Sequence, residues 1–119
     1  MTIESYRDLN VWRLAIDLAV ASYDITKRFP KDERFGLVSQ ARRAAVSVGA
    51  NIAEGHGRAH RGDYLRHLSI SRGSIKELET HMIIAYRLRY LDRPEVRTFL
   101  RKTDQISRML TTLRKRLQT

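Results

Sequence analysis

Apolar residues recur at alternating steps of three and four along most of this chain, and this spacing restricts the fold more than any other feature. The clearest run covers residues 68–85, where the steps place a continuous apolar seam along one side of a helix. Both prolines, Pro30 and Pro94, fall where helices would begin, and no β-type alternation extends beyond a few residues. The sequence therefore predicts an all-α protein.

Three short breaks separate the apolar segments. We expect Asn10 to cap the first helix and Asp32 or a neighbour to cap the second. In the third break, Asp92 and Glu95 have capping-box spacing around Pro94. Short connections favour antiparallel neighbours, so we predict one domain, residues 1–119, folded as a single antiparallel up-down-up-down four-helix bundle. An open pair of hairpins completed only by dimerisation is the alternative. The predicted helices cover residues of about 11–28, 33–55, 63–90 and 93–117.

The net charge of +10 is concentrated in the second half of the chain. Residues 1–57 carry 8 basic and 7 acidic side chains, whereas residues 58–119 carry 15 and 6. Of the basic residues, 18 are arginine and 5 are lysine, and the planar guanidinium suits phosphate recognition. This asymmetry favours an anionic partner. The competing interpretation is a solvated, highly charged surface.

Basic residues at outward positions of the predicted helices are the candidate contacts. On the last helix Arg101, Arg108 and Lys115 recur every seven residues opposite the apolar seam. Such a ridge can follow a phosphate backbone by charge alone, and no recognition-helix motif or aromatic stacking platform is evident. We therefore expect non-sequence-specific association with RNA or DNA. The full candidate set is Arg58, Arg61, Arg66, Arg87, Arg97, Arg101, Arg108 and Lys115.

The first predicted helix is apolar on two sides, which is typical of a helix that packs against other parts of the protein on both sides. One side would pack against the other helices of its own bundle and the other side against a neighbouring subunit, so we expect a homo-oligomer. A long side chain such as that of Arg13 covering the second stripe is the alternative. The candidate oligomer contact is the stripe of Leu14, Leu18, Ile25 and Phe29.

The residues suggest no catalytic or metal chemistry. The chain has no cysteine, which excludes thiolate ligands and fits a reducing, cytoplasmic location. His60 and His67 are seven residues apart, about 10 Å along a helix and too far for one ion, so we interpret the histidines as surface residues. We expect no enzyme, cofactor or metal. No apolar run approaches the ~20 residues that span a bilayer, so we expect no membrane association.

Four segments of the chain have a pattern found together in one protein family. The segments are Asp8–Trp12, Phe29–Lys31, Gln40–Gly55 and Gly73–Thr80. They resemble the bacterial four-helix proteins encoded within ribosomal RNA intervening sequences. The most specific segment is Gln40–Gly55, where this chain has Gly49 at a position often occupied by proline in the family. The resemblance implies an antiparallel four-helix bundle, commonly assembled into a ring-shaped homopentamer.

The resemblance also suggests partners and a polar site. A related branch, the accessory proteins of diversity-generating retroelements, implies binding of nucleic acid and of a reverse transcriptase. A structural adaptor ring that binds a protein partner, its arginines serving solubility, is therefore the alternative function. The family's polar stripe has counterparts on one face of the second helix, interpreted as a buried or inter-subunit hydrogen-bond network, or alternatively a ligand site. These counterparts are Gln40, Arg43, Ser47, Asn51 and Glu54.

Overall fold

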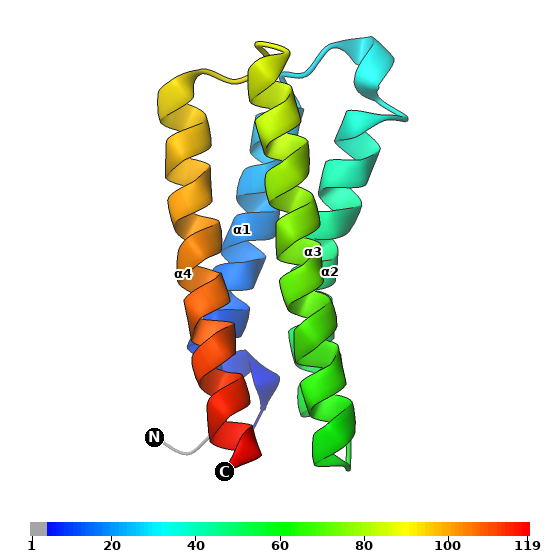
Figure 1. Ribbon diagram of the computed structural model, residues 1–119. Helices are drawn as coiled ribbons and strands as arrows, with labels where there is room; N and C mark the ends of the chain where they lie inside the picture. Colours follow the sequence, from blue (N-terminus) through cyan, green and yellow to red (C-terminus); the bar gives the residue numbers. More distant parts are fainter. Residues whose placement is uncertain (1–4) are drawn as a thin grey trace.

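The computed structural model describes residues 5–119, and in this part of the chain all regular structure is helical (Figure 1). The molecule measures 44 × 25 × 21 Å. Four long helices run alternately up and down, which confirms the predicted four-helix bundle. The elements are η1 (Tyr6–Asp8), α1 (Asn10–Thr26), η2 (Lys31–Glu33), α2 (Leu37–His56), α3 (Arg61–Arg87) and α4 (Arg93–Gln118).

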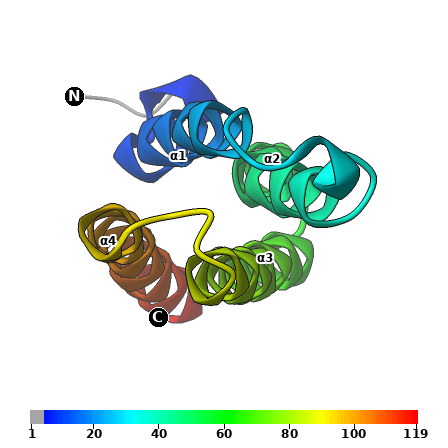
Figure 2. The same ribbon diagram turned by 90° about the horizontal axis from the view of Figure 1, so that it is seen from above.

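The helices follow one another around the bundle in chain order. Seen from above, α1 and α3 occupy diagonal corners, with α2 and α4 between them (Figure 2). Each helix therefore packs against its neighbours in sequence, and α1 closes the ring of helices by contacting α4. The outer sides of α1 and α3 consequently face in different directions.

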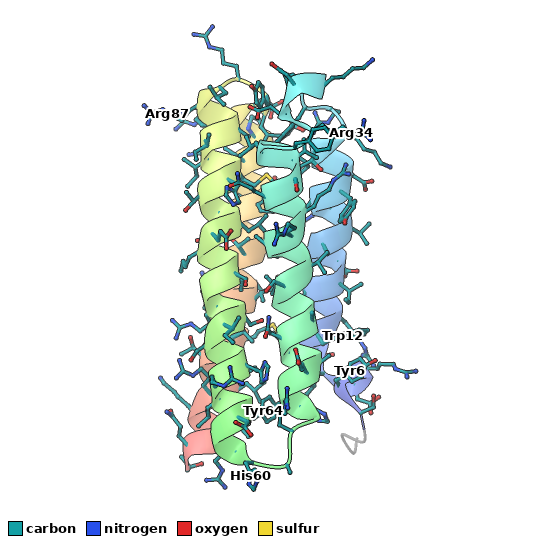
Figure 3. All side chains as sticks on the ribbon, turned by 90° about the vertical axis from the view of Figure 1, so that its right-hand side faces the viewer. Tyr6, Trp12, Arg34, His60, Tyr64 and Arg87 are labelled. Carbon is teal, nitrogen blue, oxygen red and sulfur yellow. The ribbon has the colours of Figure 1, made fainter. Side chains whose placement is uncertain are left out.

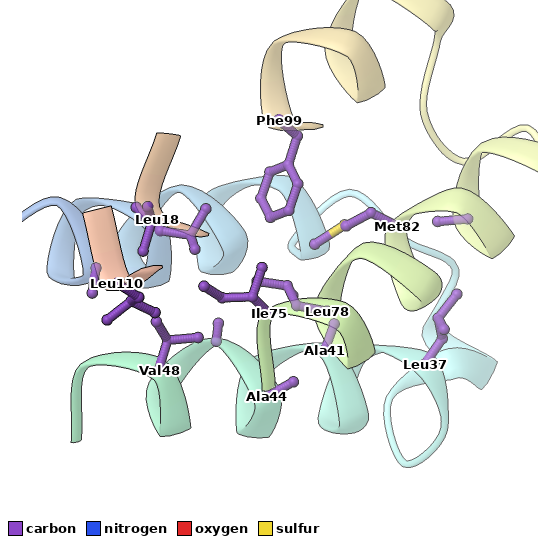
Figure 4. Packing of buried hydrophobic residues seen from close by; sticks show 14 of the residues in the cluster. Leu18, Leu37, Ala41, Ala44, Val48, Ile75, Leu78, Met82, Phe99 and Leu110 are labelled. Atoms are coloured by element: carbon purple, nitrogen blue, oxygen red, sulfur yellow. The ribbon is translucent and has the colours of Figure 1, made fainter. Parts of the chain in front are cut away.

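The predicted apolar seams form one hydrophobic core. On α3 every seam residue from Leu68 to Ala85 is buried, and on α4 the seam is buried from Phe99 to Leu110. Side chains from all four helices meet there, with Phe99 facing Met82 and Leu18 (Figure 4). Small residues on α2 allow α3 to approach closely. Gly55 is the clearest case, because a Cβ at this position would lie 2.8 Å from the Cβ of His67 on α3.

The α3–α4 connection has the predicted caps. The Asp92 carboxylate accepts a hydrogen bond from the Glu95 backbone N–H at 2.9 Å, and the Glu95 carboxylate returns one from Asp92 N–H at 3.1 Å. Glu95 also pairs with Arg28, which joins the end of α1 to the start of α4. This hydrogen bond lowers the pKa of Glu95 and raises that of Arg28. The helix α3 ends early because Arg89 adopts a left-handed backbone (φ 68°).

The starts of α1 and α2 differ from the predicted positions. The first helix begins at Asn10 itself, and the residue before it, Leu9, provides no side-chain cap. The second begins at Leu37 because η2 forms first and Gly36, at φ −105° and ψ −108°, is not helical. The predicted Asp32 cap is absent from the start of α2, where the neighbouring Glu33 carboxylate instead accepts a hydrogen bond from Leu37 N–H at 3.4 Å.

Candidate nucleic-acid interface

The most regular basic feature is a ridge along α4, formed by Arg97, Arg101, Arg108 and Lys115. All four side chains are exposed, as their position opposite the buried seam requires. From the first to the last, the ridge extends about 27 Å at ~1.5 Å per residue. Within residues 5–119 none of these four cations lies within ion-pair distance of a carboxylate. The exposed Asp104 lies on the same face between Arg101 and Arg108, so the ridge keeps a net positive charge.

The other four candidate cations are exposed but do not extend this ridge into one patch. Arg58 and Arg61 flank the α2–α3 connection, and Arg58 is paired with Glu54 at 3.2 Å. Arg66 lies near the start of α3, whereas Arg87 lies at its far end, opposite the α2–α3 connection (Figure 3). The structure therefore separates the predicted set into the α4 ridge and isolated cations at the two ends of the bundle.

A second basic surface, which the sequence did not indicate, lies between α1 and α2. Three arginines and two aromatic side chains line a groove of about 690 Å³ there. Phe35, in the loop before α2, is 86% exposed, the most exposed large apolar side chain in the described part of the chain. We call this surface the α1–α2 groove. Its principal residues are Tyr23, Arg34, Phe35, Arg42, Arg43 and Val46.

The polar stripe on α2 is only partly a hydrogen-bond network. Ser47 Oγ is 2.8 Å from Ser74 Oγ on α3, and Asn51 Nδ2 donates to Ser47 Oγ at 3.0 Å. Asn51 Oδ1 lies 3.0 Å from His67 Nδ1, so the network links α2 to α3 within one chain. Because Asn51 Nδ2 is already a donor to Ser47, the His67 Nδ1–H donates to the Asn51 oxygen.

The remaining members of the stripe do not join this network. Gln40 and Arg43 are exposed, and Glu54 forms its ion pair with Arg58 at the surface. Three of the five stripe residues therefore point outward, because the stripe is broader than the contact between α2 and α3.

We expect Asn51→Ala to lower the free energy of unfolding by about 1 to 2 kcal/mol, because it leaves the buried His67 Nδ1–H without a partner. Chemical denaturation followed by circular dichroism measures this change. The matched control is Gln40→Ala, on the same stripe but exposed, which should change stability by less than about 0.5 kcal/mol. Equal effects of the two substitutions would mean that the network does not stabilise the α2–α3 contact.

The interpretation of the histidines as surface residues is wrong for two of the four. His67 and His81 are only 4% and 8% exposed, because both lie on the side of α3 that packs toward α2. His67 Nε2 is buried without a hydrogen-bond partner in the described structure. Residues 5–119 contain no cluster of three or more potential ligands that could hold a metal ion.

The stripe predicted as the oligomer contact packs inside the chain, so this assignment is corrected. Leu18 and Phe29 are buried in the core, and Leu14 and Ile25 are half-buried against it. The stripe lies between the core and α4, which covers it within the same molecule. The outward apolar side of α1 is formed instead by Ile16, Val20 and Tyr23.

The comparisons with known proteins decide the family. The model of the 23S rRNA-intervening sequence protein family matches residues 7–112, nearly the whole chain. The chain belongs to this family. Membership explains why the α2 segment, with its polar stripe and close packing against α3, resembles the intervening-sequence proteins. A search of curated proteins finds no match to the chain.

A solved structure shows the fold independently. The chain is similar to a protein of unknown function from the S23 ribosomal protein family of Bacteroides thetaiotaomicron, with 23% identity and a TM-score of 0.79. The alignment covers 88% of this chain and 98% of that chain, so the bundle of this intervening-sequence family member corresponds to nearly the whole of the other protein. Within residues 5–119, none of the helices has the length and hydropathy needed to cross a bilayer.

Proposed function

We propose that this protein is a non-enzymatic, oligomeric binding protein whose α4 ridge associates with the phosphate backbone of RNA or DNA. The observation that carries this proposal is the exposed ridge of Arg97, Arg101, Arg108 and Lys115, none of which forms an ion pair with a carboxylate within residues 5–119. Basic side chains without carboxylate partners release counterions from nucleic acid without first breaking an internal ion pair. The proposal requires no catalytic residue, cofactor or metal.

Binding by the ridge is expected to be insensitive to base sequence. Contacts to phosphate fix the position of a protein on a duplex but carry no sequence information directly. The ridge is a single exposed helix face about 27 Å long, which can lie across several consecutive phosphates. This geometry favours a duplex or structured RNA, whose backbone is itself rigid.

The proposed oligomer is supported by two exposed apolar stripes on diagonal helices. On α1, Ile16 and Val20 are 39% and 58% exposed, four residues apart on one side. On α3, Ile70 and Ile84 are exposed two heptads apart, and Leu88 at the C-cap is exposed one turn after Ile84. Contact between two different faces is heterologous and forms a ring when the rotation closes. The number five comes from the family resemblance, and a cytoplasmic location accords with the cysteine-free sequence.

The alternative function is an adaptor ring that binds a protein partner. The observation favouring it is the same α3 stripe, since exposed apolar faces are typical of protein contacts. In that case the arginines would maintain solubility, and the partner suggested by the related retroelement branch would be a reverse transcriptase.

One purification tests both proposals. We expect protein prepared without nuclease in low salt to have the mass of a homo-oligomer. The ratio of absorbance at 260 nm to that at 280 nm should exceed the value calculated from the composition and fall to it after a high-salt wash. A monomer without nucleic acid would contradict the proposal, and a stoichiometric protein partner without nucleic acid would favour the adaptor.

A further inference from the structure

The α1–α2 groove combines positive charge with exposed aromatic surface. Of its side chains, Phe35 is 86% exposed, and Tyr23 is 40% exposed. The guanidinium carbon of Arg34 lies 5.2 Å from the centre of the Phe35 ring, and that of Arg42 lies 4.5 Å from the centre of the Tyr23 ring. Two aromatic rings are therefore each paired with an arginine in the same hollow.

One of these arginines is held in place before any ligand arrives. Arg42 Nε donates to Thr26 Oγ1 at 2.9 Å, and Arg42 Nη2 donates to the Tyr23 carbonyl at 3.5 Å. These contacts fix the guanidinium between α1 and α2. A cation that is already positioned loses little conformational entropy when it binds an anion.

The groove requires an anionic occupant. No acidic side chain lines it, and no carboxylate among residues 5–119 lies within ion-pair distance of Arg34, Arg42 or Arg43. The nearby Glu33 carboxylate is engaged elsewhere, since it accepts a hydrogen bond from the Tyr90 hydroxyl at 2.9 Å.

We propose that the α1–α2 groove binds an unpaired stretch of nucleic acid, with Phe35 stacking on a base and Arg34, Arg42 and Arg43 contacting the flanking phosphates. Arginines that follow the backbone, together with aromatic rings that stack on bases, are the combination used by single-strand binding sites. The volume of about 690 Å³ is in the range of ligand sites. This inference rests on the proposed function and adds the single-stranded substrate.

The groove and the α4 ridge are separate surfaces. The groove lies between α1 and α2, whereas α4 contacts α1 and α3 and is diagonal to α2 (Figure 2). A base in a duplex is already stacked on both sides, so only an unpaired base can use Phe35. Single-strand affinity should therefore depend on Phe35, and duplex affinity should not.

The test is fluorescence anisotropy with a labelled 12-nucleotide oligouridine and a labelled 12-base-pair DNA duplex at 50 mM salt. We expect Phe35→Ala to weaken oligouridine binding by about tenfold, as expected for losing one stacked base, and to leave duplex binding unchanged. Phe35→Trp should preserve or strengthen oligouridine binding. Ile83→Ala, which removes a 43% exposed apolar side chain on α3, outside the groove, is the matched control and should change neither affinity.

The possible results separate this inference from the proposed function. Oligouridine binding that is unaffected by Phe35→Ala, or that depends only on the α4 ridge, would overturn the groove assignment. A change in oligomeric mass with unchanged affinity would identify the groove as a protein contact and also overturn it. Binding of the duplex without binding of oligouridine would contradict only the assignment of the groove. If neither probe binds, the proposed function is contradicted as well.

Discussion

Replacing Arg101, Arg108 and Lys115 together by glutamate is expected to lower the affinity for a DNA duplex on the order of a thousandfold at 50 mM salt. The substitutions leave Arg97 as the only ridge cation, so the number of phosphate contacts falls from four to one. Each phosphate contact contributes about −0.9 to the slope of log affinity against log salt. Losing three contacts therefore reduces the affinity most at low salt concentration. Anisotropy titration of the labelled duplex measures the change.

The control is a triple substitution with the same change in net charge at a different place. Arg7, Lys27 and Lys31 are exposed, lie on or beside α1 and do not belong to the ridge. Their replacement by glutamate should reduce the affinity far less than replacement of the ridge. Equal losses for the two triple variants would show that total charge, and not the α4 ridge, determines binding.

Gly55→Ala is expected to lower the free energy of unfolding by about 2 to 3 kcal/mol, in the upper part of the range for overpacking. A Cβ at this position would lie 2.8 Å from His67 Cβ and 3.3 Å from the Tyr64 carbonyl oxygen. Neither atom is the free end of a flexible side chain, so α3 must move away from α2. That movement also lengthens the hydrogen bond between His67 Nδ1 and Asn51 Oδ1.

Gly73→Ala provides the matched control for this substitution. Gly73 lies inside α3, and a Cβ there would have no neighbour within 4 Å. We expect alanine to raise the free energy of unfolding by about 1 kcal/mol, because glycine is the poorer helix former. Urea denaturation of both variants gives the comparison, and a Gly55→Ala protein as stable as wild type would contradict the close packing of α2 on α3.

The fold was predictable because it depends on periodicity, which a sequence displays directly. The seam from Leu68 to Ala85 has one apolar side, so its buried face follows from the spacing. The capping box of Asp92 and Glu95 is equally local. The start of the second helix was less predictable, because Gly36 and the hydrogen bond from Leu37 N–H to Glu33 interrupt a pattern that looks helical.

The site was harder to predict because it depends on tertiary contacts. The first helix has two apolar stripes, and periodicity does not say which one faces the core. For this reason Leu18 was assigned to an oligomer contact, although it is buried in the core. A charge count by halves of the chain also conceals Arg34 and Arg42, since acidic residues elsewhere in the first half cancel them. Only the packing of α1 against α2 brings Arg42 to the ring of Tyr23 and places both arginines in one groove.

The salt dependence of duplex binding tests the central claim most directly. Four phosphate contacts from one subunit's ridge predict a slope of log affinity against log salt of roughly −3.6. Between 50 and 200 mM salt, the affinity should therefore fall by about 150-fold or more. A slope near zero, or no detectable binding of the duplex at 50 mM salt, would contradict the assignment of the α4 ridge to the phosphate backbone.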